Sequence, residues 1–223
     1  MTHYLAIQNT YTSMQLAIYS DISACGFVEL DKTKASKECI IALQELLKQC
    51  NLHFEDLAFI VANQGPGPFT TLRVVISTIN GLSFATQKPL IGINALEAFL
   101  KEYEQEPYKN KVVILNAFGN DLYYGIQIDT STIDIGCASA QSLLLQINQK
   151  IPAGSILFLG NGLQQHQTSI QEMFGNRAQF LNPNPQTVSL NQIAQMGLQK
   201  WAHQQDLSFQ LQPLYFKAAF VQQ

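Results

Sequence analysis

The stretch from Asn63 to Thr78 reads NQGPGPFTTLRVVIST and has the composition of a loop that leads into a helix. Glycines and prolines favour a tight turn, and an apolar run follows them. Unpaired N–H groups at the start of such a helix can hold an anion, and Arg73 could add positive charge. Pro66 and Pro68 remove two donors, however, and the loop contains no lysine, so it is not a Walker-type phosphate loop.

Two interpretations of this loop stay open. In the first, Gly65, Gly67, Thr70 and Arg73 retain a weak contact with a nucleotide. In the second, the segment is a helix-start turn that packs on a sheet and binds nothing. The residue types in the loop do not decide between the two.

The rest of the sequence offers little to catalysis. The four cysteines form no C-x-x-C pair and the four histidines are scattered, so we expect free, buried thiols and no metal site. The serines lack the G-x-S-x-G context of a nucleophile, which leaves a hydrolase without nucleophile or metal ligands. We therefore assign no catalytic residue. The cysteines are Cys25, Cys39, Cys50 and Cys137.

Composition limits the partners that the chain can bind. Of the 223 residues 47% are hydrophobic and only 13% charged, and the net charge is −3. A protein that grips nucleic acid mainly by its own charge would be basic, so any RNA-related role needs a more basic partner. We see no signal peptide and no apolar run long enough for a membrane span, and we expect a cytoplasmic protein.

The apolar pattern repeats along the chain. Each half reads as three strands, a helix, a strand and a second helix, which indicates an internal duplication. The main expected helices are 35–50, 69–86, 94–106 and 187–204, and the Gln-rich stretch after 161 has no expected element. A charged, Pro-containing stretch separates the halves, so we expect subdomains 1–106 and 107–223. The order predicts an α/β fold with two mixed sheets flanked by helices.

This duplicated order is similar to the actin-like ATPase fold (the ASKHA, RNase H-like group). The segment from Val61 to Phe99 resembles the signature of the TsaB (YeaZ) family, which reads G-N-G-P-G-S-F-T-G-L-R followed by a small-residue helix and a strand. Pro68 and Thr71 depart from that signature, and weaker resemblance extends to Pro213–Phe220. The matching residues are Gly65, Pro66, Gly67, Phe69, Thr70, Leu72, Arg73, Gly81, Leu82, Pro89, Leu90, Gly92, Leu96 and Glu97.

The resemblance also shows which acids this chain lacks. Members of the TsaB family commonly have Asp where this chain has Gln8, and Asp again where it has Asn116. A neutral amide is a weak ligand for Mg²⁺ and cannot act as a general base. We expect both amides to satisfy nearby backbone groups, and we expect no phosphoryl transfer by the chain alone.

The helices 35–50 and 69–86 are apolar on more than one side, whereas a helix on the outside of a sheet needs a single apolar stripe. The surplus predicts a contact with a second protein, and the alternative is that both are central helices of the core. The residues expected at the partner interface are Cys39, Leu43, Leu46, Leu72, Val75, Ile76, Ile79 and Ser83.

The resemblance implies a non-catalytic scaffold. Proteins similar to TsaB use these two helices to pair with themselves or with TsaD, which attaches threonylcarbamoyl to the adenosine beside the tRNA anticodon. It implies a homodimer when alone, a TsaD-like catalytic subunit and a TsaE-like ATPase as partners, and tRNA contact only through the complex. It implies no tightly bound cofactor, with ATP or ADP at the partner interface left open. The alternative function is a small-molecule kinase or ATPase of the actin-like fold.

Overall fold

The computed structural model describes residues 1–129 and 132–216, which divide into two compact units. The first unit comprises Met1–Ala98 and Ser189–Leu214. The second comprises Phe99–Val188, with Tyr215 and Phe216 of the described chain. The units differ from the contiguous halves 1–106 and 107–223 expected from the sequence, because the last helix of the chain packs on the first sheet.

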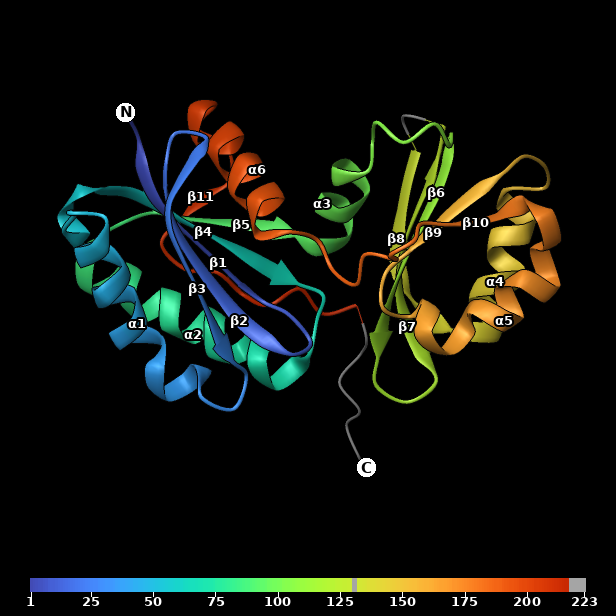
Figure 1. Cartoon of the computed structure of the whole chain (residues 1–223), viewed down its shortest axis with the longest axis horizontal. Helices are drawn as coiled ribbons and strands as arrows, with labels where there is room; N and C mark the ends of the chain where they lie inside the picture. The colour runs from blue at the N-terminus through green and yellow to red at the C-terminus, as the bar shows by residue number, and fades with distance from the viewer. Residues whose placement is uncertain (130–131, 217–223) are drawn as a thin grey trace. The chain divides into compact units, whose positions relative to one another are not determined.

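The first unit is built on a six-stranded sheet with the order β11-β5-β4-β1-β2-β3 (Figure 1). The strands β1, β2 and β3 form an antiparallel meander, and β4 and β5 run parallel to β1. The short strand β11 pairs antiparallel with β5. The bounds are β1 His3–Asn9, β2 Ser13–Ser20, β3 Ser23–Asp31, β4 Leu57–Gly65, β5 Leu90–Asn94 and β11 Leu207–Ser208.

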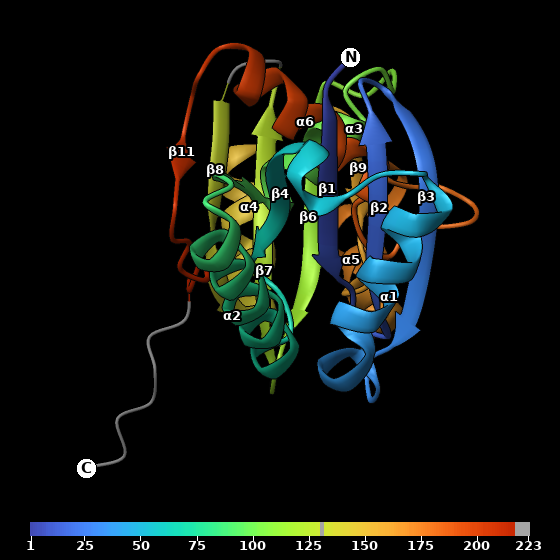
Figure 2. The same cartoon turned by 90° about the vertical axis from the view of Figure 1, so that its left-hand side faces the viewer.

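Helices cover both faces of this sheet. The helices α1 (Ala35–Gln49) and α2 (Phe69–Thr86) pack on one face, as Figure 2 shows, and a short 3₁₀ turn η1 (Phe54–Asp56) leads from α1 to β4. The last helix, α6 (Leu190–Ala202), packs on the other face. Both faces of the central strands are therefore buried, which explains their nearly continuous apolar sequence.

An aromatic stack fills the core beneath α6. The ring of Tyr4 lies 4.6 Å from that of Phe59, which lies 4.9 Å from Trp201, measured between centroids. The Tyr4 hydroxyl donates to the carbonyl oxygens of Asp21 and Ala194. The single tryptophan of the chain is thus a packing residue.

The second unit repeats the topology of the first. Its sheet has the order β10-β9-β6-β7-β8, which corresponds strand by strand to β5-β4-β1-β2-β3. The expected α/β fold, duplicated and with two mixed sheets, is confirmed. The bounds are β6 Asn110–Ala117, β7 Asp121–Ile128, β8 Thr132–Ser139, α4 Ala140–Lys150, β9 Ile156–Leu159, α5 Leu163–Phe174, η2 Gly175–Arg177 and β10 Ala178–Phe180.

Two helices differ from the sequence expectation. The Gln-rich stretch forms α5, which buries only Leu163, Ile170 and Phe174, and its other positions carry polar side chains that hide the helical period. The helix α3 (Ala95–Glu102) ends before Glu106, because residues after Glu102 turn away in the charged, Pro-containing stretch.

Close packing of α6 on β4 depends on Gly197. A Cβ atom at this position would lie 2.4 Å from Cγ2 of Val61, a fully buried side chain on a central strand. We predict that Gly197→Ala lowers the free energy of unfolding by about 1–3 kcal/mol through overpacking. Chemical denaturation of the full chain measures this change.

The matched control is Gly81→Ala on α2. A Cβ atom there would meet no heavy atom within 4 Å, so we expect this variant to gain about 0.5–1 kcal/mol from helix propensity. Equal effects of the two substitutions would contradict the packing of α6 on β4.

Candidate functional site

The loop between β4 and α2 is shaped around Gly65. This residue has φ +105°, and its N–H donates to Oδ1 of Asn63 at 2.9 Å. A Cβ atom at Gly65 would lie 2.8 Å from Cδ2 of Leu72, the first buried residue of α2. Glycine is therefore required both by the backbone conformation and by the close approach of the helix.

The other residues proposed for nucleotide contact lie in the loop before α2, at Gly67, and in the first turns of α2. A Cβ atom at Gly67 would meet no heavy atom within 4 Å, and Thr70 is exposed. The guanidinium of Arg73 lies 3.8 Å from the centroid of the Phe69 ring on the same helix. The first-turn N–H groups of α2 are the donors that an anion would use here. The contact with a nucleotide stays a prediction.

Polar side chains form a hydrogen-bonded row across four strands at the end of β1. The Nδ2 of Asn63 donates to Oε1 of Gln8 at 3.4 Å, and Nε2 of Gln8 donates to Oε1 of Gln15 at 2.8 Å. The Nε2 of Gln15 in turn donates to Oε1 of Glu29 at 3.2 Å, and Ser13 also donates to that oxygen. We call this set Asn63, Gln8, Gln15 and Glu29 the amide row.

The structure gives Gln8 side-chain partners that the sequence did not predict. Its amide bonds to side chains on neighbouring strands, because the register places Gln8 opposite Gln15, and Gln15 opposite Glu29. Gln8 is 1% exposed. A buried amide with its hydrogen bonds filled holds the strand ends together and offers no charge to a metal ion.

The second unit repeats the loop at its equivalent position, and sequence inspection missed it. After β9 the chain turns at Gly160, with φ +103°, and enters α5, as Gly65 precedes α2. A Cβ atom at Gly160 would lie 2.3 Å from the carbonyl oxygen of Ile114. Nearby, Oδ1 of Asn161 accepts from the N–H of Asn116 at 3.0 Å. The sequence Gly-Asn-Gly at residues 160–162 is the signal from which this second loop could have been predicted.

The eight residues expected at the partner interface lie in the core of the first unit. All are at most 3% exposed, and all but Ser83 pack between α1, α2 and the sheet. Both helices are apolar on this side because they cover the sheet, so these side chains meet their own strands. The exposed apolar side chains of the two helices are instead Ile40, Ile41, Phe69 and Phe84.

A second flank of α2 is covered by the chain's own C-terminal part. We call residues 209–214 the C-terminal strap. Asn80 binds both backbone groups of Leu211 at 2.9 Å, and Ser83 donates to the carbonyl oxygen of Phe209 at 3.2 Å. Leu211 joins the core beneath α2. The strap therefore covers part of the apolar surface of α2 that the sequence assigned to a partner. Of the segment Pro213–Phe220, which resembles the TsaB family, residues 217–220 lie outside the described part.

Metal-binding clusters and membrane-spanning helices are both absent from the described residues. Within residues 1–129 and 132–216, no group of three or more His, Cys, Asp or Glu side chains is placed to hold a metal ion. In the same ranges, the helices are too short or too polar to cross a bilayer.

Comparison with known proteins places the chain in a family. The family model described as TsaD, tRNA N6-adenosine threonylcarbamoyltransferase, matches residues 29–212, which is most of the chain. The chain belongs to the TsaD family. Its match includes α1, the loop after β4, α2 and the C-terminal strap up to Gln212.

Curated relatives include both branches of this family. The chain is 29% identical over 111 residues to the tRNA threonylcarbamoyladenosine biosynthesis protein TsaB of Buchnera aphidicola from Acyrthosiphon pisum, covering 50% of each chain. It is 31% identical over 99 residues to a tRNA N6-adenosine threonylcarbamoyltransferase of Onion yellows phytoplasma, covering 43% of this chain and 42% of the relative. The chain thus spans half or less of the length of these relatives.

Solved structures share the fold at low identity. A protein from Pseudomonas aeruginosa with similarity to peptidase YeaZ superposes with a TM-score of 0.73 at 18% identity, over 97% of this chain and 100% of that one. A YeaZ structure from the same organism gives 0.71 over 96% and 100%, also at 18% identity. The resemblance to the TsaB (YeaZ) proteins is confirmed.

The amide row makes a specific prediction. Replacing Gln8 by leucine keeps a side chain of similar length but removes the partner of Asn63 Nδ2 and of Gln15 Oε1. We expect Gln8→Leu to lower the free energy of unfolding by about 1–3 kcal/mol, measured by urea denaturation. The control Gln44→Leu, at an exposed position of α1, should change it by less than about 0.5 kcal/mol. A neutral Gln8→Leu variant would contradict the structural role of the row.

Proposed function

We propose that this chain is a non-catalytic subunit in the biosynthesis of threonylcarbamoyladenosine in tRNA. It binds and activates a TsaD-like catalytic subunit, with a TsaE-like ATPase in the same assembly, and it meets tRNA only through that complex. Family membership supports the pathway. The observation that carries the non-catalytic role is that Gln8, at the end of β1, is a neutral amide whose neighbours in the row, Asn63 and Gln15, are also neutral.

Charge supports the need for a partner. The net charge is −3, and the chain carries 13 basic against 16 acidic residues. A protein that binds tRNA phosphates by itself usually carries an excess of lysine and arginine, and this chain has none. A catalytic subunit with its own basic surface therefore supplies the tRNA contact in the proposed complex.

The outer sides of α1 and α2 are the proposed docking face. Ile41 on α1 is 56% exposed and Phe84 on α2 is 82% exposed. Two small residues of α2, Ser77 and Gly81, are exposed between Arg73 and Phe84. A Cβ atom built on Gly81 would meet no heavy atom within 4 Å. Small residues allow another helix to approach closely, and large apolar neighbours supply burial. The occupant is the TsaD-like subunit, and a second copy of this chain takes its place when it is absent.

The docking face can be tested by charge insertion. Ile41→Glu and Phe84→Glu should each weaken binding to the TsaD-like subunit of the same organism by at least about tenfold, because a carboxylate would be desolvated at the interface. Titration calorimetry measures the affinity. Exposed positions are used because a charge at Ile76, which is 3% exposed, would disrupt the core itself.

The control for this experiment is Leu145→Glu. Leu145 is 51% exposed on α4 of the second unit, outside the docking face. We expect its affinity to match that of the unchanged chain. If all three variants bind equally well, the partner does not use α1 and α2.

The kinase or ATPase alternative has a separate test. Because Gln8 and Asn116 provide no carboxylate for Mg²⁺, we expect the isolated chain to show no ATP turnover above the uncatalysed rate. A coupled assay for ADP release, with the reconstituted complex as positive control, measures this. Turnover by the isolated chain that Gln8→Leu abolishes would establish the enzyme instead.

A further inference from the structure

The strand β3 contains an irregularity at Cys25. In the ladder between β2 and β3, Gly26 pairs with Ile18 and Ala24 pairs with Tyr19, so Cys25 has no cross-strand partner. An extra residue of this kind is a β-bulge, which locally re-aims a side chain. Cys25 is exposed, and β3 lies at the edge of its sheet.

The end of α1 lies directly over this bulge. A Cβ atom at Gly26 would lie 3.1 Å from Sγ of Cys50 and 2.8 Å from Cδ1 of Leu46. Cys50 is the C-cap residue that follows α1, and its N–H donates to the carbonyl oxygen of Leu46 at 3.1 Å. The absence of a side chain at Gly26 therefore lets the Cys50 thiol approach the backbone beside Cys25.

The Cys50 thiol lies beside Gly26, the residue next to Cys25, so the two thiols are neighbours. Burial raises the pKa of Cys50, and the neighbouring Cys25 raises it further through its charge and through a hydrogen bond between the two side chains. The other thiols are placed differently. Burial raises the pKa of Cys39 to about 11 inside the core, and Cys137 lies on β8 of the second unit. Cys25, which is exposed, and Cys50, which is half-buried, therefore form a pair that is separate from Cys39 and Cys137.

We propose that Cys25 and Cys50 form a redox modification site that a low-molecular-weight disulfide converts into an intramolecular disulfide bond. The Cys25 thiolate attacks one sulfur of the small disulfide, forms a mixed disulfide and releases one thiol. Cys50 gives its proton to solvent and attacks the Cys25 sulfur, which releases the second thiol. The pair loses two electrons and two protons, and the small disulfide is reduced to two thiols.

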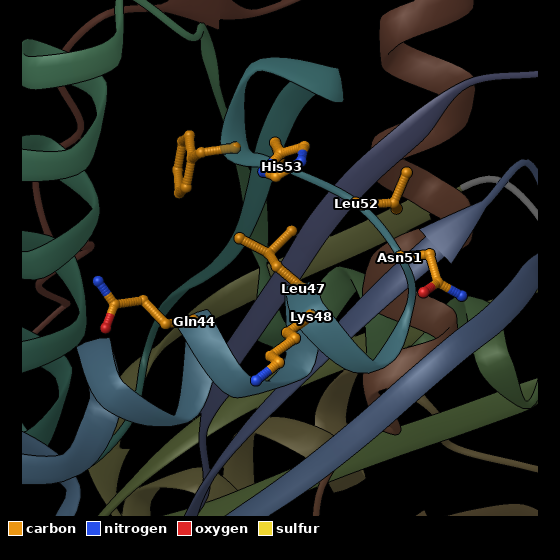
Figure 3. A pocket seen from close by; sticks show the side chains of 7 residues that line it. Gln44, Leu47, Lys48, Asn51, Leu52 and His53 are labelled. Atoms are coloured by element: carbon orange, nitrogen blue, oxygen red, sulfur yellow. The ribbon is translucent and has the colours of Figure 1, made fainter.

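The bond would tie the edge strand to the end of α1. Immediately beyond Cys50, the chain forms a wall of an open pocket of about 740 Å³ (Figure 3). Leu47 and Lys48 line it from the last turn of α1, and Asn51, Leu52 and His53 line it from the connection to η1. Oxidation would therefore restrain this wall, and the inference depends on the first unit alone rather than on the proposed function.

The experiment uses the full chain, reduced and then equilibrated with oxidised glutathione under anaerobic conditions. We expect the thiols titrated after denaturation to fall from four to two, and non-reducing peptide mapping to join the Cys25 and Cys50 peptides. The melting temperature should rise by about 5 °C or more, since the bond closes a loop in the unfolded chain.

Single substitutions give the controls. Cys137→Ser should still form the bond, whereas Cys25→Ser and Cys50→Ser should each prevent it. Circular dichroism on every reduced variant establishes that it folds, and Cys50→Ala replaces Cys50→Ser if the latter does not. Four remaining thiols, a glutathione adduct that persists on Cys25, or a bond to Cys39 or Cys137 would each overturn the proposal.

Discussion

The burial of α2 between the first sheet and the C-terminal strap is the constraint on which the rest of the unit depends. On one side Leu72, Val75 and Ile79 pack on the strands. On another, Asn80 and Ser83 hold the backbone of the strap. Two restraints on different flanks fix the rotation of the helix about its axis. A single outward stripe then remains, and it contains the residues available to a partner.

The same constraint shapes the loop before the helix. Leu72 approaches Gly65 so closely that no side chain fits there, and the strap reaches the loop through the N–H of Leu214, which donates to the carbonyl oxygen of Gln64 at 2.9 Å. The glycine loop of this chain therefore has a packing function that is independent of any ligand. Beside it, the amide row joins β4, β1, β2 and β3 by side-chain bonds. A strand end organised in this way suits a rigid binding subunit.

Much of the fold was predictable from the sequence because the apolar periods of the strands and of α1 and α2 are strong. The topology of both sheets follows from the repeated order of elements. The helix α5 was not predictable, since mostly polar residues occupy its outward face and only three buried apolar residues mark the period. The packing of α6 on the first sheet was also not predictable, because the local apolar pattern of a helix does not show which sheet the helix covers.

The candidate site was less predictable than the fold. Sequence inspection identified α1 and α2 as important but selected the inward side, because buried and partner-facing residues are both apolar. Only the structure separates Ile76, which meets the sheet, from Phe84, which faces outward. Likewise, the neutral character of Gln8 was readable in the sequence, whereas its bond to Gln15 depends on the register of β1 and β2.

Amide hydrogen exchange, followed by mass spectrometry with and without the TsaD-like subunit, tests the central claim most directly. The account predicts slower exchange in peptides of α1 and α2 on complex formation, with α4 and α5 unchanged. Slower exchange confined to α4 and α5, with α1 and α2 exchanging as in the free chain, would contradict it.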